Sequence, residues 1–348
     1  MAEIADVPGV DSDAVSRWLA TLGIEFAAPL RFQRVGLGQS NLTYRVTDAA
    51  DRSWVLRRPP LGHLLASAHD VVREARIIAA LEHTDVPAPR ILGVTSDSAF
   101  SDAPMVLMEF VDGLVVDTMR VAEGLTPQRR REIAVSMPCT LAKIHAVDLT
   151  EVGLADLASH KPYAQRQLKR WTGQWELSKT RELPELDDLT RRLVAAVPEQ
   201  RETTLVHGDF HLRNLIVSRD TGEIVATLDW ELSTLGDPLA DMGSLLTYWT
   251  EPGEAAIGDF APSTLDGCPD RVEMTRLYLE QTGRDPAALQ YWHALGLWKL
   301  AIIAEGVMRR AMDEPQNKAA AGTPDTAWID AVVHRARAVA DAAGIGID

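Results

Sequence analysis

The stretch Leu205-Val-His-Gly-Asp-Phe-His-Leu-Arg-Asn-Leu-Ile-Val217 decides the fold of this chain. An apolar strand start is followed by a polar turn and then by a second apolar strand. The turn gathers the side chains that can take part in chemistry, namely His207, Asp209, His211 and Asn214. This stretch predicts a loop that presents several reactive groups at one place.

The spacing from Asp209 to Asn214 is the one that protein kinases use in their catalytic loop. There the aspartate accepts the proton of the attacking hydroxyl, and the asparagine binds a metal ion. A following apolar strand, 224–228, ends in Asp229-Trp-Glu231. Because Mg²⁺ prefers hard oxygen ligands, a carboxylate at this strand end and Asn214 predict a magnesium-nucleotide site.

Upstream of this loop, the pattern predicts a small α+β lobe. Gly36-Leu-Gly-Gln-Ser-Asn41 has two glycines that let backbone amides approach phosphate oxygens closely. Alternating residues over 42–57 predict an antiparallel hairpin, and a helical apolar face predicts a helix over 71–81. Two more strands are expected at 90–95 and 105–110, and a short amphipathic helix is expected at 14–22.

The order of these motifs resembles the aminoglycoside phosphotransferase (choline-kinase-like) superfamily over about residues 30 to 310. The shared features are a glycine loop, a VLR strand, a helix with Glu74, MEFVDG, HGDxxxxN and LDWE. VLRRPP, HGDFHLRN and TLDWELSTLGDPLADMG are most similar to the branch of kinase domains fused to acyl-CoA dehydrogenases. The resemblance implies a two-lobed, protein-kinase-like α+β fold, with a small antiparallel-sheet N-lobe and a larger, mainly helical C-lobe. It also implies an ATP- and Mg²⁺-dependent phosphotransferase that acts on a hydroxyl of a small molecule.

Carried over by motif, the resemblance implies a role for each of several residues. Asp209 would be the catalytic base, and Asn214 and Asp229 would bind Mg²⁺. The residues expected to contact ATP are Gly36, Gly38, Gln39, Ser40 and Asn41 over the phosphates, Arg57 and Glu74, and the hinge residues Glu109, Phe110 and Val111. Arg57 stands where kinases have lysine, and a guanidinium can still hold both phosphate and Glu74. Arg58 is an alternative for this role.

The domain organisation that we expect has three parts. Residues 1–28 form a helical extension, 29–112 the nucleotide-binding N-lobe, and 113–348 the C-lobe with the catalytic loop and the acceptor site. Pro138 falls within a helical pattern and predicts a kink or a break there. Asp237 is expected to cap a helix, and Asp241 to brace the catalytic loop.

Composition limits the classes of partner. The chain has 348 residues, with 35 Lys and Arg against 50 Asp and Glu, and a formal net charge of −15. This charge opposes binding to nucleic acid or anionic lipid, so no such partner is expected. The N-terminal residues carry acids and a proline where a signal peptide would have a basic start, which predicts a cytoplasmic protein. The apolar run 292–307 is too short for a bilayer and predicts a buried helix.

One stretch, 161–181, departs from the acidic average of the chain. It contains one acid, Glu176, against six basic residues, Lys161, Arg166, Lys169, Arg170, Lys179 and Arg181. Trp171 and Trp175 stand one helical turn apart within it. This pattern favours an acceptor that is anionic and partly apolar, such as a hydroxyacyl compound. The alternative is a solvated basic face with both tryptophans packed inward.

Two other functional classes remain open at this level. His207, Asp209 and His211 alternate along the chain and could hold a metal ion in a metal-dependent hydrolase. A kinase-like module could also bind ligands without transferring phosphate, since a fold does not imply an activity.

Overall fold

The computed structural model describes residues 7–35, 41–61, 70–159, 161–256, 260–313 and 323–346. The chain forms two compact units. The first contains Met1–Gly113 and Val225–Glu231, and the second contains Leu114–Ile224 and Leu232–Asp348. An antiparallel sheet dominates the first unit and helices dominate the second, which confirms the expected two-lobed α+β fold. Unlike the boundaries expected from the sequence, the first unit includes a late segment, 225–231.

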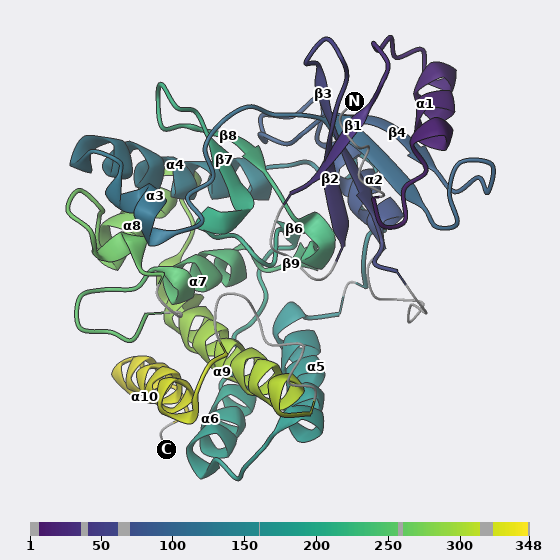
Figure 1. The fold of residues 1–348 in the computed structure, drawn as a ribbon. Coiled ribbons are helices and arrows are strands. Elements are labelled where there is room, and N and C mark those ends of the chain that lie inside the picture. Colours follow the sequence, from purple (N-terminus) through teal and green to yellow (C-terminus); the bar gives the residue numbers. More distant parts are fainter. Residues whose placement is uncertain are drawn as a thin grey trace. The chain divides into compact units, whose positions relative to one another are not determined.

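The first unit is built on a five-stranded antiparallel sheet with the strand order β1-β2-β3-β5-β4 (Figure 1). The strands are β1 (Arg31–Arg34), β2 (Leu42–Thr47), β3 (Ser53–Arg58), β4 (Ile91–Thr95) and β5 (Met105–Glu109). The predicted hairpin is confirmed as β2 and β3, in which Thr43 lies opposite Arg57. Strand β1 was not predicted, because Arg31-Phe-Gln-Arg34 has a single apolar residue at the edge of the sheet.

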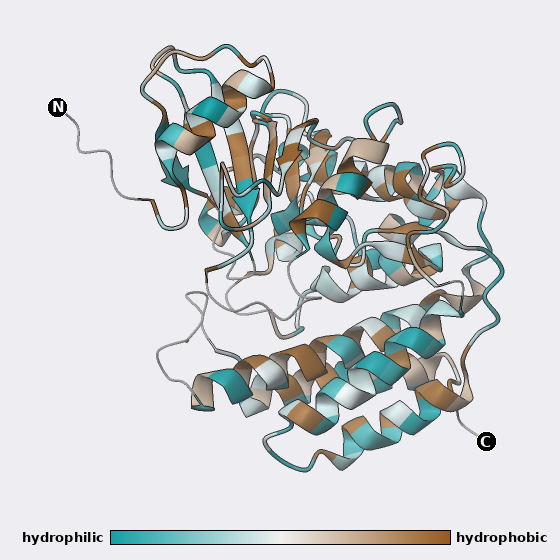
Figure 2. Ribbon diagram, turned by 90° about the vertical axis from the view of Figure 1, so that its right-hand side faces the viewer, coloured by the Kyte–Doolittle hydropathy of each residue, from teal (hydrophilic) through white to brown (hydrophobic). Residues whose placement is uncertain are grey.

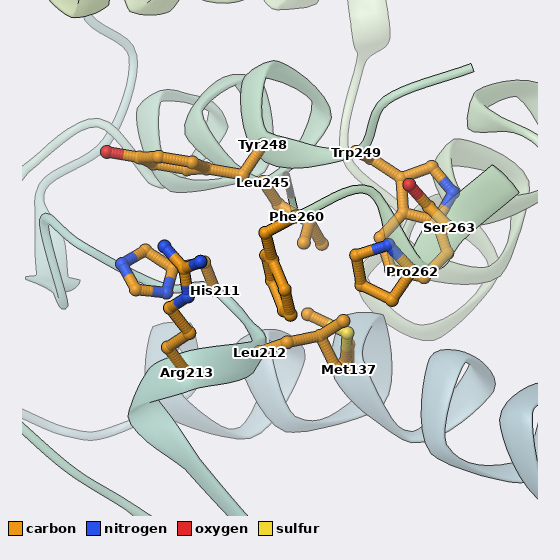
Figure 3. A pocket seen from close by; sticks show the side chains of 10 residues that line it. All are labelled: Met137, His211, Leu212, Arg213, Leu245, Tyr248, Trp249, Phe260, Pro262 and Ser263. Atoms are coloured by element: carbon orange, nitrogen blue, oxygen red, sulfur yellow. The ribbon is translucent and has the colours of Figure 1, made fainter. Parts of the chain in front are cut away.

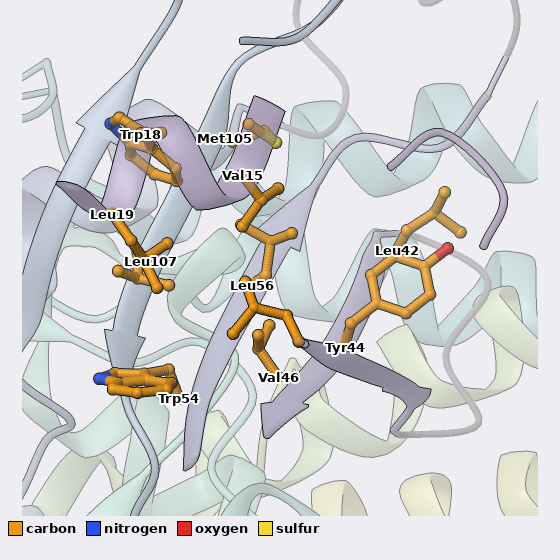
Figure 4. Packing of buried hydrophobic residues seen from close by; sticks show 11 residues of the cluster. Val15, Trp18, Leu19, Leu42, Tyr44, Val46, Trp54, Leu56, Met105 and Leu107 are labelled. Atoms are coloured by element: carbon orange, nitrogen blue, oxygen red, sulfur yellow. The ribbon is translucent and has the colours of Figure 1, made fainter. Parts of the chain in front are cut away.

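Helix α1 (Ser12–Thr21) packs on one face of this sheet (Figure 4). Asp11 caps its N-terminus, accepting hydrogen bonds from the amides of Asp13 and Ala14. The buried side chains of α1 join those of the strands in one cluster that includes Val15, Trp18, Leu19, Leu42, Tyr44, Val46, Trp54, Leu56, Met105 and Leu107. Helix α1 is therefore part of the core of the first unit, and not a separate extension.

Helix α2 (Val71–Ala80) contacts strands β4 and β5. Asp70 caps the helix by accepting a hydrogen bond from the amide of Arg73. Apolar side chains of α2 pack with Val106 and Met108, whereas Met105 and Leu107 of the same strand belong to the cluster under α1. Because successive strand residues point to opposite faces, α1 and α2 cover the two faces of the sheet.

The second unit is mainly helical (Figure 1). Its α-helices are α3 (Met119–Glu123), α4 (Pro127–His145), α5 (Tyr163–Ser178), α6 (Pro184–Ala195), α7 (Pro238–Tyr248), α8 (Arg271–Thr282), α9 (Leu289–Asp313) and α10 (Thr326–Ala342). Helix α9 is buried over most of its length and packs against α5, α6, α7 and α10. Hydrophobic and hydrophilic bands alternate along these helices in Figure 2.

The long helices bear on two of the sequence predictions. The buried helix expected at 292–307 is confirmed as part of α9. Helix α4 continues through Pro138, so of the predicted kink or break, the break is wrong. Pro138 is buried together with its neighbours Met137 and Leu141. Among the helices of the described ranges, none combines the length and apolarity that a membrane span requires.

Short strands and single turns carry the motif residues. The second unit contains β6 (Thr204–Val206), the 3₁₀ turn η1 (Leu212–Asn214), β7 (Leu215–Val217) and β9 (Thr234–Gly236), and β6 pairs with β9 in an antiparallel manner. The segment 225–231 of the first unit contains most of strand β8 (Ile224–Thr227) and the start of the 3₁₀ turn η2 (Trp230–Leu232). Two further 3₁₀ turns, η3 (Pro262–Thr264) and η4 (Pro286–Ala288), lie later in the chain.

Candidate active site

Arg57 lies at the centre of a cluster of charges in the first unit. Its Nε atom is 2.9 Å from Oε2 of Glu74, and its Nη2 atom is 2.8 Å from Oδ1 of Asp229. Oε2 of Glu231 lies 3.9 Å from the same Nη2 atom. Strand β3 carries the guanidinium, helix α2 supplies one carboxylate, and the segment after strand β8 supplies the other two.

Burial sets the electrostatics of this cluster. Burial raises the pKa of Glu74 to about 7, with Asp229 and Glu231 acting in the same direction and Arg57 opposing them. Burial would lower the pKa of Arg57, but the carboxylates of Glu74 and Asp229 more than offset it and the pKa is raised. Arg57 therefore stays charged. The carboxylates outnumber the one cation, so the surroundings of Arg57 carry an excess of negative charge when all three are ionised.

Asp229 has an unusual backbone conformation for a residue other than glycine. Its φ angle is +64°, in the left-handed region. The next residue is firmly held, because the amide of Trp230 donates to Oε1 of Glu74 at 3.2 Å and its indole donates to the carbonyl of Thr227 at 3.0 Å. Strained backbone of this kind persists where the surroundings fix it, and it is common at functional sites.

Arg58 lies on the opposite face of strand β3 from Arg57. Its side chain is buried next to the core cluster, where Nη1 donates to the carbonyl of Gly9 and Nη2 lies 2.9 Å from Oδ1 of Asp102. Arg57, and not Arg58, is thus the arginine placed with Glu74 and Asp229.

The remaining residues expected to contact ATP are described in part. Gly36, Gly38, Gln39 and Ser40 lie outside the described residues. Asn41 is buried, and its Nδ2 atom donates to Oε2 of Glu231 at 3.3 Å. The guanidinium carbon of Arg45 lies 4.2 Å from the ring centre of Phe110. Among the described residues, no hydrogen-bond acceptor faces the backbone amides of Phe110 and Val111, whereas the amide of Glu109 donates to the carbonyl of Arg90.

The second unit holds the loop that contains Asp209. The turn η1 brings Asn214 back to Asp209, where its Nδ2 atom donates to the backbone carbonyl at 2.9 Å and to Oδ2 at 3.1 Å. Nε2 of His211 lies 3.3 Å from the same Oδ2 atom. Burial alone would raise the pKa of Asp209, but His211, Lys299 and His207 together hold it well below its usual range. Asp209 is therefore ionised at neutral pH.

His207 and His211 do not form a metal site with Asp209. His207 is fully buried, and its Nδ1 atom accepts a hydrogen bond from the amide of Asp209 at 3.3 Å. The ring of His211 lies 4.7 Å from that of Tyr248. No group of three His, Cys, Asp or Glu residues in the described part of the chain is arranged to hold a metal ion. The geometry therefore gives no support to the hydrolase alternative.

Asp241 braces this loop from helix α7, as the sequence predicted. Its carboxylate accepts hydrogen bonds from the backbone amides of His207 at 2.6 Å and Gly208 at 2.8 Å. Nε2 of His145 lies 3.2 Å from Oδ2 of Asp241, and Nδ1 of His145 lies 2.8 Å from the hydroxyl of Tyr278. Burial lowers the pKa of His145, so the neutral ring can donate to Asp241 from Nε2 and accept from Tyr278 at Nδ1.

Two side chains near Asp209 were missed by the sequence analysis. The hydroxyl of Tyr248 donates to Oδ1 of Asp209 at 3.5 Å, and Nζ of Lys299 donates to the carbonyl of Gly208 at 3.4 Å. Tyr248 ends helix α7 and Lys299 lies within α9, far from the loop in sequence. A lysine that interrupts a buried helical pattern was the available signal for Lys299.

A small pocket lies beside the loop in the second unit (Figure 3). Its volume is about 40 Å³. The lining is mostly apolar or aromatic and consists of Met137, His211, Leu212, Arg213, Leu245, Tyr248, Trp249, Phe260, Pro262 and Ser263. The guanidinium of Arg213 lies 4.0 Å from the ring centre of Phe260. His211 and Tyr248 belong both to this pocket and to the surroundings of Asp209.

In the basic stretch 161–181, some side chains bind to neighbouring groups of the protein and others are exposed. Trp175 is buried and donates to Oδ1 of Asp187 at 3.0 Å, whereas Trp171 is only partly buried. Arg166 donates to the carbonyls of Lys161 and Leu235, and Lys179 and Arg181 form ion pairs with nearby acids. Lys161, Lys169 and Arg170 remain exposed. The alternative interpretation, in which both tryptophans pack inward, is therefore correct for Trp175 and only partly correct for Trp171.

Comparisons with known proteins agree with these features. A model of the phosphotransferase enzyme family matches residues 31–273. Acyl-CoA dehydrogenase family member 10 from Mus musculus is 36% identical over 317 residues, which cover 90% of this chain and 30% of that protein. The chain thus spans about a third of the length of this curated relative.

Solved structures show the same fold. A protein from Ralstonia eutropha, provisionally named an aminoglycoside phosphotransferase, has a TM-score of 0.76 and 31% identity, with 96% of this chain and 97% of that chain covered. A thermostable mutant of aminoglycoside phosphotransferase APH(4)-Ia, solved with AMP-PNP and hygromycin B, has a TM-score of 0.61 and 14% identity. The alignment with that structure covers 95% of this chain and 99% of the other.

Proposed function

Because the chain belongs to the phosphotransferase enzyme family, we propose that it transfers the γ-phosphoryl group of ATP to a hydroxyl of a small molecule. The observation that carries this proposal is the pairing of Asp209 with Asn214 across the turn η1, at 2.9 and 3.1 Å. An ionised carboxylate held in this way can accept a proton, and the asparagine keeps its carboxamide oxygen for another ligand.

Asp209 is the catalytic base in this proposal. His211, Lys299 and His207 keep its carboxylate ionised in spite of burial. As the acceptor hydroxyl attacks the γ-phosphorus, its proton passes to Asp209, and the bond from phosphorus to the oxygen that bridges the β- and γ-phosphates breaks. Asn214 and the amides held by Asp241 fix the position of the base before the acceptor arrives.

The residues that we propose to bind Mg²⁺ and phosphate are those of the family's motifs. Asp229 and Asn214 would each supply an oxygen ligand to Mg²⁺, which neutralises phosphate charge when bound. The negative charge around Arg57 supports Asp229 in this role, and the carboxamide oxygen of Asn214, for which the described residues offer no donor, supports Asn214. Arg57 would hold phosphate oxygens while Glu74 orients its guanidinium.

The other nucleotide contacts follow the same scheme. Gly36, Gly38, Gln39, Ser40 and Asn41 would cover the phosphates, and Glu109, Phe110 and Val111 would meet the base. The amides of Phe110 and Val111, for which the described residues offer no acceptor, are suited to this contact. The AMP-PNP in the APH(4)-Ia structure supports ATP as the donor.

For the acceptor, we propose a hydroxylated compound that is anionic and partly apolar, such as a hydroxyacyl compound. The apolar pocket beside His211 and Tyr248 supports the apolar part, and the exposed cations of helix α5 support the anionic part. The similarity to an acyl-CoA dehydrogenase family member is consistent with an acyl compound. A polycationic aminoglycoside would be repelled by the same cations.

The decisive experiment measures phosphate transfer from ATP and from GTP to a panel of hydroxylated compounds. The panel contains hydroxycarboxylic acids, hydroxyacyl thioesters, neutral sugars, choline and kanamycin, and the Asp209→Asn variant is the background control. We expect Mg²⁺-dependent transfer to a hydroxyacyl or other anionic member and none to kanamycin. Transfer to kanamycin alone would contradict the acceptor class. Nucleotide binding without transfer to any member would favour a silent kinase-like module.

A further inference from the structure

Lys299 is a cation near Asp209 that forms no direct ion pair among the described residues. It lies on helix α9, where Nζ makes one long hydrogen bond of 3.4 Å to the carbonyl of Gly208, next to Asp209. Within the described ranges no ion pair involves Lys299. An ammonium group can donate three hydrogen bonds, so most of its capacity is available to a ligand. The side chain is partly exposed and a ligand can therefore reach it.

A second cation lies on the same aromatic ring. Nζ of Lys299 is 5.3 Å from the ring centre of Trp171, and the guanidinium carbon of Arg170 is also 5.3 Å from it. The ring is held in place, because the indole of Trp171 donates to Oε1 of Gln167 at 3.1 Å. Helices α5 and α9, which carry these residues, pack against each other (Figure 1).

Charges of both signs act on Lys299. Burial lowers the pKa of Lys299, and the charge of Arg170 acts in the same direction, whereas Asp209 and Asp241 oppose the shift. Both cations approach the ring of Trp171, so an anion that binds at this ring can interact with two positive charges. The ring itself offers an apolar surface for a chain attached to that anion.

We propose that Lys299, Trp171 and Arg170 form a subsite for the oxyanion headgroup of the acceptor, a carboxylate or a phosphate, with its alkyl chain on the indole. This inference rests on the proposed function, because it assigns the anionic end of the acceptor to particular residues. In this proposal the main anion-binding residue is Lys299 of α9, which lies outside the basic stretch 161–181. Arg166 of that stretch is not part of the subsite, because its guanidinium already donates to two backbone carbonyls.

The test is a binding titration of the full chain without nucleotide. Hexanoate, hexyl phosphate and the neutral analogue hexanamide are added while tryptophan fluorescence is recorded, and a Trp171→Phe variant identifies the contribution of that ring among the nine tryptophans. We expect at least one anion to bind about tenfold or more tightly than hexanamide, because an ammonium-to-oxyanion hydrogen bond is charge-assisted. The tighter of the two anions identifies the headgroup.

Matched variants assign the binding to Lys299. Lys299→Met is expected to weaken anion binding by about 10- to 100-fold, and Lys299→Arg to retain most of it. Lys143→Met removes an exposed lysine of α4, away from the basic stretch, and is expected to bind as the unmodified chain does. Equal binding of hexanamide and both anions to the unmodified chain, or no saturable anion binding, would overturn the proposal without reference to any variant.

The outcome for the subsite is separate from that for the proposed function. Anion binding that depends on Lys299, in a chain that phosphorylates no compound of the panel, would retain the subsite and reject the kinase activity. Phosphate transfer with the same acceptor KM in the unmodified chain and in Lys299→Met would retain the kinase activity and reject the subsite.

Discussion

Nη2 of Arg57 lies 2.8 Å from Oδ1 of Asp229, so the residue proposed to hold phosphate is hydrogen bonded to a residue proposed to hold the metal. The same guanidinium reaches Glu74 through Nε at 2.9 Å. A lysine has a single charged nitrogen and cannot present two separate edges to two carboxylates. Arginine at this strand position therefore links helix α2 to the turn after β8 within the first unit.

Replacing Arg57 by lysine tests this double contact. Arg57→Lys keeps the charge but loses one of the two charge-assisted contacts, so we expect the KM for ATP to rise about tenfold. Steady-state kinetics with ATP as the varied substrate measures this change. Arg58→Lys is the comparison. Because Arg58 packs next to the core and bonds to Gly9, that variant should lower the melting temperature and leave the KM for ATP near its original value.

Asp209→Ala is expected to separate turnover from nucleotide binding. General-base catalysis contributes about 10²- to 10⁴-fold, so kcat should fall by a factor in this range. The affinity for ATP should change little, because the base acts on the acceptor. Single-turnover transfer and calorimetric titration with ATP provide the two measurements. A variant with full turnover would remove Asp209 from the catalytic role.

Asp229→Ala is expected to weaken the binding of the Mg²⁺ complex of ATP. The carboxylate would ligate the metal, and its loss removes one oxygen donor. Calorimetric titrations in the presence of Mg²⁺ and in the presence of EDTA should therefore differ strongly for the unmodified chain and weakly for the variant. If the Mg²⁺ dependence is the same in both proteins, Asp229 is not a metal ligand.

His293 gives a prediction on stability against pH. This residue of α9 is buried, and burial lowers its pKa to about 3, with Arg335 and Arg271 acting in the same direction. The unfolded chain, in which histidine titrates near 6.5, then binds more protons than the folded chain between these two values. The contribution is thus fully present above pH 6.5 and is lost as pH falls, by about 1.4 kcal/mol per pH unit.

Replacing His293 by phenylalanine removes this contribution. Urea unfolding of the unmodified chain and of His293→Phe at pH 7 and pH 5 gives the free energy of unfolding of each. We expect the unmodified chain to lose more stability between the two values than the variant does, by about 2 kcal/mol. Identical pH dependence of the two proteins would show that His293 does not control acid stability.

The sequence predicted elements with strong local patterns. The β2–β3 hairpin, helix α2 and the buried helix α9 follow from alternation or helical periodicity within each segment. The edge strand β1 has no such pattern, because its backbone pairing with β2 defines it. Helix α4 continues through the buried Pro138, and the local rule for proline does not take such burial into account.

The candidate site shows a similar division. Asp209 and Asn214 are close in sequence, so their spacing indicated their contact, and the structure places them in direct hydrogen-bond contact. The contact of Lys299 with Gly208 joins positions far apart in the chain, and no local pattern encodes it. Periodicity could not distinguish Trp175 from Trp171, because the hydrogen-bond partner of Trp175, Asp187, lies on a different helix.

The bracing of the loop that contains Asp209 by Asp241 has a practical consequence for redesign. Asp241 grips the loop through the backbone amides of His207 and Gly208, which every residue type except proline provides. This brace does not depend on the side chains of the two residues, although Gly208 has a φ of +83° and a Cβ there would lie 2.8 Å from the carbonyl oxygen of Leu232. A library that varies the neighbouring pocket, except for His211 and Tyr248, which contact Asp209, can therefore search for new acceptors while the loop keeps its position, provided that α7 keeps its aspartate.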